Sequence, residues 1–214
     1  MKEIFRAYRF KLQPNNEQKI LLSKHFGSVR FVYNYFLDQR KNAYLNGEKL
    51  NYHVQCKYLT ELKKKEEYEW LNEINSQSLQ ASLTNLEVAY LRFFKGLGQF
   101  PNFKSKKGKN SYHIPQNVKI NNNYLSIPKF KEPIKFIKCR EIKGTILNAT
   151  ISKTPTNEYF VSLLCKEQYE PFQKTGKQVG IDLGIKDQLI TSDGIKYKNN
   201  KYFKKYERKL ANVQ

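Results

Sequence analysis

The chain opens with a strict alternation of side chains. Over residues 4–12, one set of alternate positions holds Ile4, Arg6, Tyr8, Phe10 and Leu12, and the other holds Phe5, Ala7, Arg9 and Lys11. A period of two rich in aromatic residues predicts a β-strand. Pro14 and the pair Asn15-Asn16 are expected to end this strand and open a helix. The basic residues can be a solvated face or a surface lying on nucleic acid, and the strand alone favours the solvated face.

Residues 16–98 change to helical spacing. The apolar positions predict a short helix near residues 20–22, a second from about 25 to 45, a third over 54–62 and a strong fourth over 78–94. Asn46-Gly47 ends the second, and Gly96 with Gly98 ends the fourth. Such helices form a bundle. A DNA-binding helix-turn-helix over residues 16–45 is the alternative, and the spacing favours plain bundle core.

Residues 99–172 lose the helical period. Short apolar runs predict strands at about 124–127, 134–139, 146–153 and 159–165, separated by Pro128, Pro133, Gly144 and residues 154–157. Strands at this spacing are typical of a small β-barrel or sandwich. Helices together with these strands predict an α+β fold.

The last stretch begins with a carboxylate inside an apolar strand. Residues 179–184 read Val-Gly-Ile-Asp-Leu-Gly, so Asp182 is expected in a buried strand. A second strand over 185–191 and a hairpin turn at Ser192-Asp193-Gly194 follow. Tyr202, Phe203, Tyr206 and Leu210 then recur at helical spacing, which predicts a helix.

Charge narrows the class of protein. The 214 residues include 39 Lys and Arg against 19 Asp and Glu, a formal net charge of +20. Self-repulsion of this size is tolerated when a polyanion neutralises it, and phosphate backbones are the commonest polyanion. No run of about 18 apolar residues predicts a membrane span, and the N-terminal sequence has no apolar core typical of a signal peptide. We therefore expect a bacterial cytoplasmic, nucleoid-associated protein.

Cysteine and histidine give no metal signature. Cys56, Cys139 and Cys165 are far apart and odd in number, which makes a disulfide framework or a zinc site unexpected. The histidines, His25, His53 and His113, are also scattered and are expected on the surface or in the core.

Basic residues gather where nucleic acid could lie. Residues 101–140 contain ten Lys or Arg and a single acid, Glu132. A solvated surface normally mixes its signs, whereas one-signed charge with aromatic residues between suits a phosphate groove with stacking platforms. The loop Phe100–Lys109, with Lys104, Lys106, Lys107 and Lys109, is the leading candidate. Residues 196–209 add seven Lys or Arg against Glu207 alone.

Asp182 is the candidate catalytic residue and metal ligand. Asp is depleted in strands and costly inside them, and a bound divalent cation would offset that cost. A mid-strand Asp begins the ribonuclease-H-like sheet, where paired Mg²⁺ ions assist phosphodiester hydrolysis. The same short motif also opens actin-like and chaperone-type ATPases, so both readings stand. Asp187 and Asp193 do not look like further ligands, and the only later acid is Glu207.

Several collinear motifs together are more specific than any one of them. The segments that carry a resemblance are residues 8–14, Glu17-Gln18, residues 26–34, residues 69–71, residues 76–80, Asn85-Leu86, Ala89-Tyr90, Phe93-Phe94, residues 100–104, residues 180–186 and residues 192–194. Through them the chain resembles the OrfB/TnpB proteins of insertion sequences over essentially its whole length.

The resemblance implies a fold, an activity and partners. Family members are similar to compact type V CRISPR effectors, and a guide RNA from the transposon end directs them to cut DNA beside a short transposon-adjacent motif. The implied domains are the first strand of a wedge β-barrel at 1–14, a helical recognition domain at 15–110, the rest of the barrel at 111–174 and the start of a RuvC nuclease at 175–214. Asp182 matches the first RuvC carboxylate.

The duplex beside the adjacent motif would be read at Tyr52, Ser76, Gln77 and Gln80, or these residues are plain helix surface. Arg6 and Arg9 are further candidate contacts to nucleic acid.

The sequence lacks the later part of the family pattern. The later catalytic Glu, four-cysteine zinc site and final Asp of the family have no counterpart here. We therefore expect the two Mg²⁺ ions only in a complete protein, no zinc in these residues, and binding of guide RNA and duplex DNA without cutting by this chain alone. A non-catalytic DNA- or RNA-binding regulator and an inert remnant, prone to aggregate through its unpaired sheet, are the alternatives.

Overall fold

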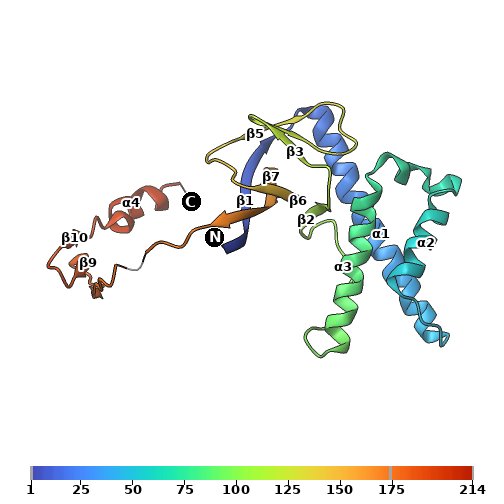
Figure 1. Ribbon diagram of the computed structural model, residues 1–214, viewed down its shortest axis with the longest axis horizontal. Helices are drawn as coiled ribbons and strands as arrows, with labels where there is room; N and C mark the ends of the chain where they lie inside the picture. Colours follow the sequence, from blue (N-terminus) through green and yellow to red (C-terminus); the bar gives the residue numbers. More distant parts are fainter. Residues whose placement is uncertain (1, 174, 214) are drawn as a thin grey trace. The chain divides into compact units, whose positions relative to one another are not determined.

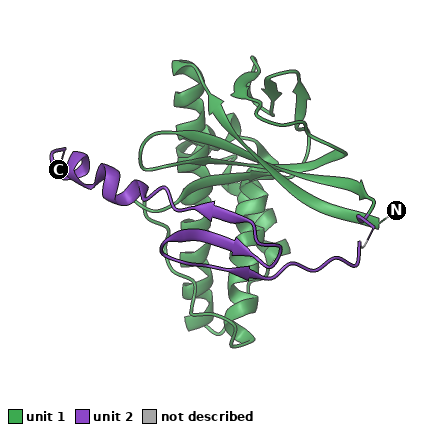
Figure 2. Cartoon of the chain, turned by 90° about the vertical axis from the view of Figure 1, so that its left-hand side faces the viewer, with its two compact units in different colours: residues 1–170 green, residues 171–214 purple. Residues whose placement is uncertain are grey.

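The computed structural model describes residues 2–173 and 175–213, which form two compact units, residues 1–170 and 171–214 (Figure 2). The first unit combines a helical segment with a curled antiparallel sheet (Figure 1). The second holds three short strands and a helix. The α+β class predicted from sequence is confirmed.

Strand β1 (Lys2–Gln13) lies in the middle of a seven-stranded sheet with the order β2-β6-β7-β1-β5-β4-β3. It pairs with β7 (Tyr159–Tyr169) from Lys2 to Leu12, and its last residues pair with β5 (Ile134–Ile137). Tyr8, Phe10 and Leu12 are buried, whereas Arg9 and Lys11 on the other face are exposed, so the predicted alternation is confirmed. The N-terminal strand therefore joins the two halves of a sheet whose other strands all lie beyond residue 109.

The remaining strands complete the sheet on both sides. Strand β6 (Thr145–Lys153) pairs with β7 and with the edge strand β2 (Asn110–Ile114), while β4 (Tyr124–Ser126) joins β5 to the other edge, β3 (Lys119–Asn121). Strands β4 to β7 confirm the sequence prediction. Strands β2 and β3 were not predicted, because their side chains lack a regular apolar alternation.

Between β1 and β2 the chain forms the helices. The structure has one 30-residue helix, α1 (Asn16–Leu45), where the sequence analysis expected two. Asn15 and Gln18 form a reciprocal cap at its start, and Asn46 with Gly47, at φ +76°, ends it. Apolar positions such as Leu22, Phe26 and Val29 continue the helical period across the expected break. The residues 16–45 therefore contain no turn, and the helix-turn-helix alternative is wrong for them.

Two further helices confirm the bundle. Helix α2 (Tyr52–Leu62) begins at the cap residue Asn51, and α3 (Ser76–Phe94) begins at Asn75. A 3₁₀ helix, η1 (Glu66–Glu73), lies between them and was not predicted; it buries Leu71. The helices and the sheet share one core, in which Tyr112 of β2 packs edge-on against Phe26 of α1 with ring centroids 5.5 Å apart.

The second unit corrects one expectation. Its sheet has the order β10-β9-β8, from β8 (Ile181–Asp182), β9 (Asp187–Thr191) and β10 (Lys196–Lys198), followed by helix α4 (Tyr202–Ala211). The Asp193 turn and the helix agree with the prediction. The strand at Asp182 is not buried: Ile181 and Leu183 are 59% and 74% exposed. β8 is a two-residue edge strand paired on one side only, and no layer of the described unit covers its apolar side chains.

Candidate nucleic-acid interface

A groove in the first unit collects four of the residues selected from sequence. Its volume is about 780 Å³, and Tyr52 of α2, Gln77 and Gln80 of α3, and Lys104 of the basic loop line it. The opposite wall comes from β2 and β6 and includes His113 and Thr150. We call this cavity the α3–β2 groove. Residues far apart in the chain therefore form one polar surface.

The helical period explains why α3 presents these side chains. Gln77, Gln80, Ala81, Thr84 and Asn85 follow the i, i+3, i+4, i+7, i+8 spacing of one helix face, and that face lines the groove. The alternate face carries Leu79, Leu83 and Leu86, which are fully buried. The apolar face fixes the rotation of α3, and amide and hydroxyl groups are left facing the groove.

One groove residue has an unused hydrogen-bonding atom. The Gln77 side-chain oxygen is buried, and no donor among residues 2–173 and 175–213 reaches it. A buried acceptor without a partner costs about 1–3 kcal/mol. A ligand that donates a hydrogen bond to Gln77 would recover that energy.

Two other groove residues, Tyr52 and His113, have shifted pKa values. The Cys56 side chain raises the pKa of Tyr52, and burial adds to this effect. Burial lowers the pKa of His113, whose Nδ1 lies 3.3 Å from the Thr150 hydroxyl. The Tyr52 hydroxyl and the His113 imidazole are therefore neutral near pH 7, and in that form they can donate and accept hydrogen bonds without carrying a charge.

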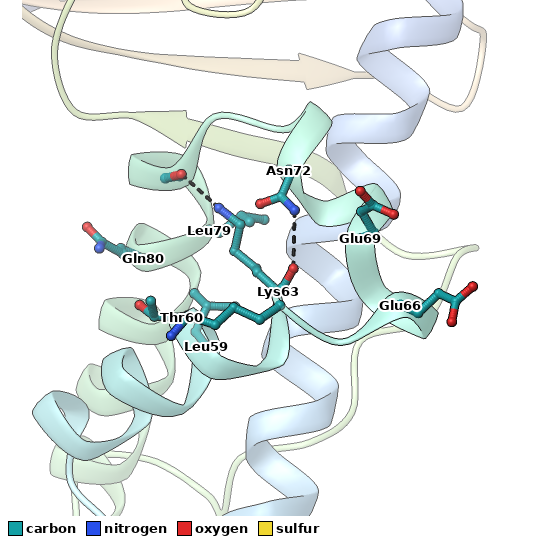
Figure 3. A pocket seen from close by; sticks show the side chains of 10 residues that line it. Leu59, Thr60, Lys63, Glu66, Glu69, Asn72, Leu79 and Gln80 are labelled. Atoms are coloured by element: carbon teal, nitrogen blue, oxygen red, sulfur yellow. Dashed lines mark hydrogen bonds between the residues drawn. The ribbon is translucent and has the colours of Figure 1, made fainter.

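Ser76 lies apart from this group. Its hydroxyl accepts a hydrogen bond from the Lys63 ammonium at 3.0 Å, and it lines a second cavity of about 740 Å³ that also reaches Gln80. Figure 3 shows that cavity, where the Asn72 side chain donates to the Lys63 carbonyl at 3.1 Å. Burial and the nearby Lys129 lower the pKa of Lys63. Gln80 is thus the residue shared by the two cavities.

The basic loop is held by two consecutive residues of α1. The Asn34 side chain donates to the Lys104 carbonyl at 2.9 Å and accepts from the Lys104 backbone N–H at 2.7 Å. The Lys104 ammonium lies 3.9 Å from the centre of the Tyr33 ring, and partial burial there lowers its pKa. Lys106, Lys107 and Lys109 follow in an exposed turn. The loop therefore presents its lysines from a defined backbone position.

Arg6 and Arg9 are not part of the groove. They lie on opposite faces of β1. Arg6 pairs with the buried Glu167, with Nη1 and Oε2 3.3 Å apart, and Tyr8 donates to the same carboxylate. The Arg9 guanidinium stacks 4.2 Å from the centre of the Phe160 ring. Arg6 therefore has a structural partner, whereas Arg9 remains on an exposed face.

Asp182 supplies a single exposed carboxylate. Within residues 2–173 and 175–213, no three His, Cys, Asp or Glu side chains lie close enough together to hold a metal ion. The described residues therefore do not form a magnesium site around Asp182, and no cleavage step can be derived from them. No described helix is long and apolar enough to cross a membrane.

Sequence reasoning missed several residues around the groove. His113, Gln116 and Thr150 come from strands or their ends, and Arg30 comes from α1. Arg30 lies within the motif of residues 26–34 that carried the family resemblance, which was the one signal available for it.

The chain matches known proteins along its whole length. Residues 1–49 match the OrfB/IS605 family described as "Helix-turn-helix domain". A Streptomyces pristinaespiralis protein named "Putative RNA-guided DNA endonuclease" is 33% identical over 219 residues, which cover 100% of this chain and 54% of the relative. The similarly named InsQ of Escherichia coli K12 is 30% identical over 212 residues, which cover 97% of this chain and 52% of InsQ.

A third relative is shorter. "Virulence protein VsdF" of Salmonella dublin is 37% identical over 116 residues, which cover 50% of this chain and 98% of that protein. The chain spans about half the length of the two endonuclease relatives. The matched family, the two endonuclease relatives and the collinear motifs agree, and the chain therefore belongs to the OrfB/TnpB family of insertion-sequence proteins.

Proposed function

We propose that this chain is the nucleic-acid-binding part of an RNA-guided DNA endonuclease. It binds a guide RNA from the transposon end and holds target DNA beside a short transposon-adjacent motif. The names of the two longer relatives support the class of activity. The chain covers about half of each, so the proposal assigns binding to these residues and leaves cutting to a complete protein.

The α3–β2 groove is the observation that carries the proposal. Gln side chains bond both adenine edge atoms in the major groove, and Gln77 and Gln80 stand on one helix face with room in front of them. Lys104, in the same groove, has no carboxylate within ion-pair distance among the described residues, so its charge remains for a phosphate. Base-reading amides beside a phosphate-binding cation fit duplex DNA.

The proposed domain plan follows the family. The seven-stranded sheet is the wedge barrel, the segment of α1, α2, η1 and α3 is the recognition domain, and residues from 175 begin the RuvC domain. The insertion of the helices between β1 and β2 supports this plan. Asp182 is proposed as the first RuvC carboxylate. When Mg²⁺ is bound in a complete domain, it would assist phosphodiester hydrolysis, for which this unit alone lacks the ligands.

The test is a binding selection with the 214-residue chain. A duplex library with a short randomised segment beside a fixed target is equilibrated with the protein and the adjoining transposon-end RNA, and bound duplexes are sequenced. We expect one short motif to be enriched. Gln80→Ala is expected to weaken the selected duplex by about 5- to 150-fold, because a bidentate base contact discriminates by about 1–3 kcal/mol.

The matched control is Gln99→Ala, which removes an exposed glutamine that does not line the groove. We expect this variant to select and bind the same motif as the unaltered chain. Enrichment of no motif, with or without the RNA, would refute sequence reading by this chain. Binding and motif selection without any RNA would favour a DNA-binding regulator instead.

A further inference from the structure

Beside the α3–β2 groove lies a smaller cavity lined by cations. Its volume is about 260 Å³, and Arg30, Lys104 and Lys109 line it together with Ser105 and Ser111. No Asp or Glu is among its lining residues, and none of the three cations forms an ion pair within the described part of the chain. Three cationic residues that line one cavity without a counter-charge repel one another, and an anion in the cavity would reduce that repulsion.

The cavity is built by hydrogen bonds and not by flexible lysines alone. Asn110 accepts a hydrogen bond from Arg30 Nη1 at 3.3 Å, and its own amide donates to the Gly108 carbonyl at 3.3 Å. Gly108 donates back to the Ser105 carbonyl at 3.2 Å, which closes the turn. These contacts orient the guanidinium and the loop before any ligand arrives, and a guanidinium suits phosphate because its donors match paired oxygens.

The cavity shares a wall with the α3–β2 groove. Lys104 and Ser111 line both. Asn34 holds the Lys104 backbone through two hydrogen bonds, so the shared wall has a fixed position. An extended ligand with its bases in the groove can therefore place a backbone phosphate in the smaller cavity.

We propose that this cavity is a phosphate-binding pocket in which Arg30 contacts one backbone phosphate of the DNA held in the adjoining groove. The proposal rests on the proposed function for the identity of the strand. The pocket sets the register of the duplex, because a phosphate fixed beside Lys104 determines which base pair faces Gln77 and Gln80. Arg30 therefore positions the DNA without reading its sequence.

The test measures how affinity for the selected duplex depends on salt. Each phosphate contact contributes about 0.9 to the slope of log affinity against log salt concentration, so losing one costs about eightfold at 0.1 M salt. We expect Arg30→Gln and Lys109→Gln each to reduce the slope by about one and to weaken all duplexes alike. Arg30→Lys keeps the charge and is expected to retain most of the slope.

Lys19→Gln is the matched control, since it removes one positive charge from the same helix at an exposed position outside the pocket. Its slope is expected to stay within 0.3 of the unaltered chain, an estimate of about a third of one contact. If Arg30→Gln changes the slope no more than Lys19→Gln does, the pocket holds no backbone phosphate. If the unaltered chain shows no salt-dependent binding at all, the proposed function fails first, so the two failures are distinguishable.

Inorganic phosphate separates a strand contact from a site for free phosphate. The backbone amide of Gly108 in the turn is followed by NMR during titration with phosphate and, separately, with the duplex. We expect the duplex to shift this amide at micromolar concentration and phosphate to do so only at millimolar concentration. Micromolar binding of phosphate, with an unchanged salt slope for Arg30→Gln, would overturn the proposal in favour of a free-phosphate site.

Discussion

Arg40 ties the three helices together, and its removal tests the energetics of the bundle. The side chain is 8% exposed; its Nε donates to Gln55 Oε1 at 2.8 Å, and its Nη2 pairs with Glu87. Gln55, which is fully buried, donates in turn to the Phe36 carbonyl at 2.9 Å. The guanidinium also lies 4.9 Å from the centre of the Tyr90 ring. One residue of α1 thus connects α2 and α3.

We expect Arg40→Ala to lower the free energy of unfolding by about 3 kcal/mol. The substitution leaves the buried Gln55 oxygen without a donor, which costs about 1–3 kcal/mol, and it leaves the Glu87 carboxylate without its cation. Removing one partner of a buried ion pair costs about 3–5 kcal/mol, and the lower end applies because the Glu87 side chain is 29% exposed. The shift amounts to more than a hundredfold in the unfolding equilibrium.

The assay is urea unfolding followed by circular dichroism, with Arg92→Ala as control. Arg92 lies on α3, is exposed and donates only a 3.4 Å hydrogen bond, to the Leu97 carbonyl, so its loss is expected to stay within about 0.5 kcal/mol. The double variant Arg40→Met with Glu87→Leu is expected to recover the part of the loss that comes from Glu87, because an apolar pair leaves no charge buried alone, whereas the Gln55 oxygen still lacks its donor. A loss below 1 kcal/mol for Arg40→Ala would refute the reasoning.

Two further predictions concern stability. Gly144 has φ +74°, and a Cβ there would lie 2.1 Å from the Lys166 carbonyl oxygen, so Gly144→Ala is expected to lower the free energy of unfolding in urea by at least about 2 kcal/mol. The control Gly27→Ala, at a position of α1 with open space, should stabilise the chain by up to about 1 kcal/mol, and equal effects of the two variants would contradict the clash. Burial lowers the pKa of His25, so the unfolded state binds a proton more readily than the folded state does. The free energy of unfolding should therefore be at its full value above pH 6.5 and fall below that pH by up to about 1.4 kcal/mol per pH unit. His25→Gln should flatten this dependence, and an unchanged pH profile in the variant would contradict the account.

Local patterns predicted most of the first unit. The alternation around Tyr8 and Phe10 placed β1, and helical spacing placed α2 and α3, because these elements bury one side against a single core. The break expected between residues 22 and 25 was wrong because Leu22, Phe26 and Val29 continue one buried helix face across it. Strand β2 was missed because its alternate residues face a polar groove, so the apolar alternation is weak.

The candidate site could also be predicted only in part from the sequence. Gln77 and Gln80 were selected through the family resemblance, and their spacing alone did not distinguish them from plain helix surface. Their place beside Lys104 depends on the hydrogen bonds that Asn34 forms with that residue, a contact between residues 70 positions apart. Arg30 lies within a motif that carried the resemblance, but its contact with Asn110 joins residues 80 positions apart, which the motif does not predict. The prediction that Asp182 lies in a buried strand was wrong for a different reason. An apolar strand indicates that a helix or a second sheet covers it, and the described residues of that unit include no such covering layer.

The continuous α1 helix also changes where DNA should be sought. A helix-turn-helix reads DNA with a second helix set at about 90–120° to the first after a turn of three or four residues. Residues 1–49 match a family with that description, but residues 2–49 form strand β1 and the single helix α1, whose residues Phe26, Val32 and Phe36 are buried in the common core. Core positions such as these cannot contact DNA. The polar face of α3 lines the α3–β2 groove with Gln77 and Gln80, which makes variants of that face, and not of α1 core positions, the informative test of base recognition.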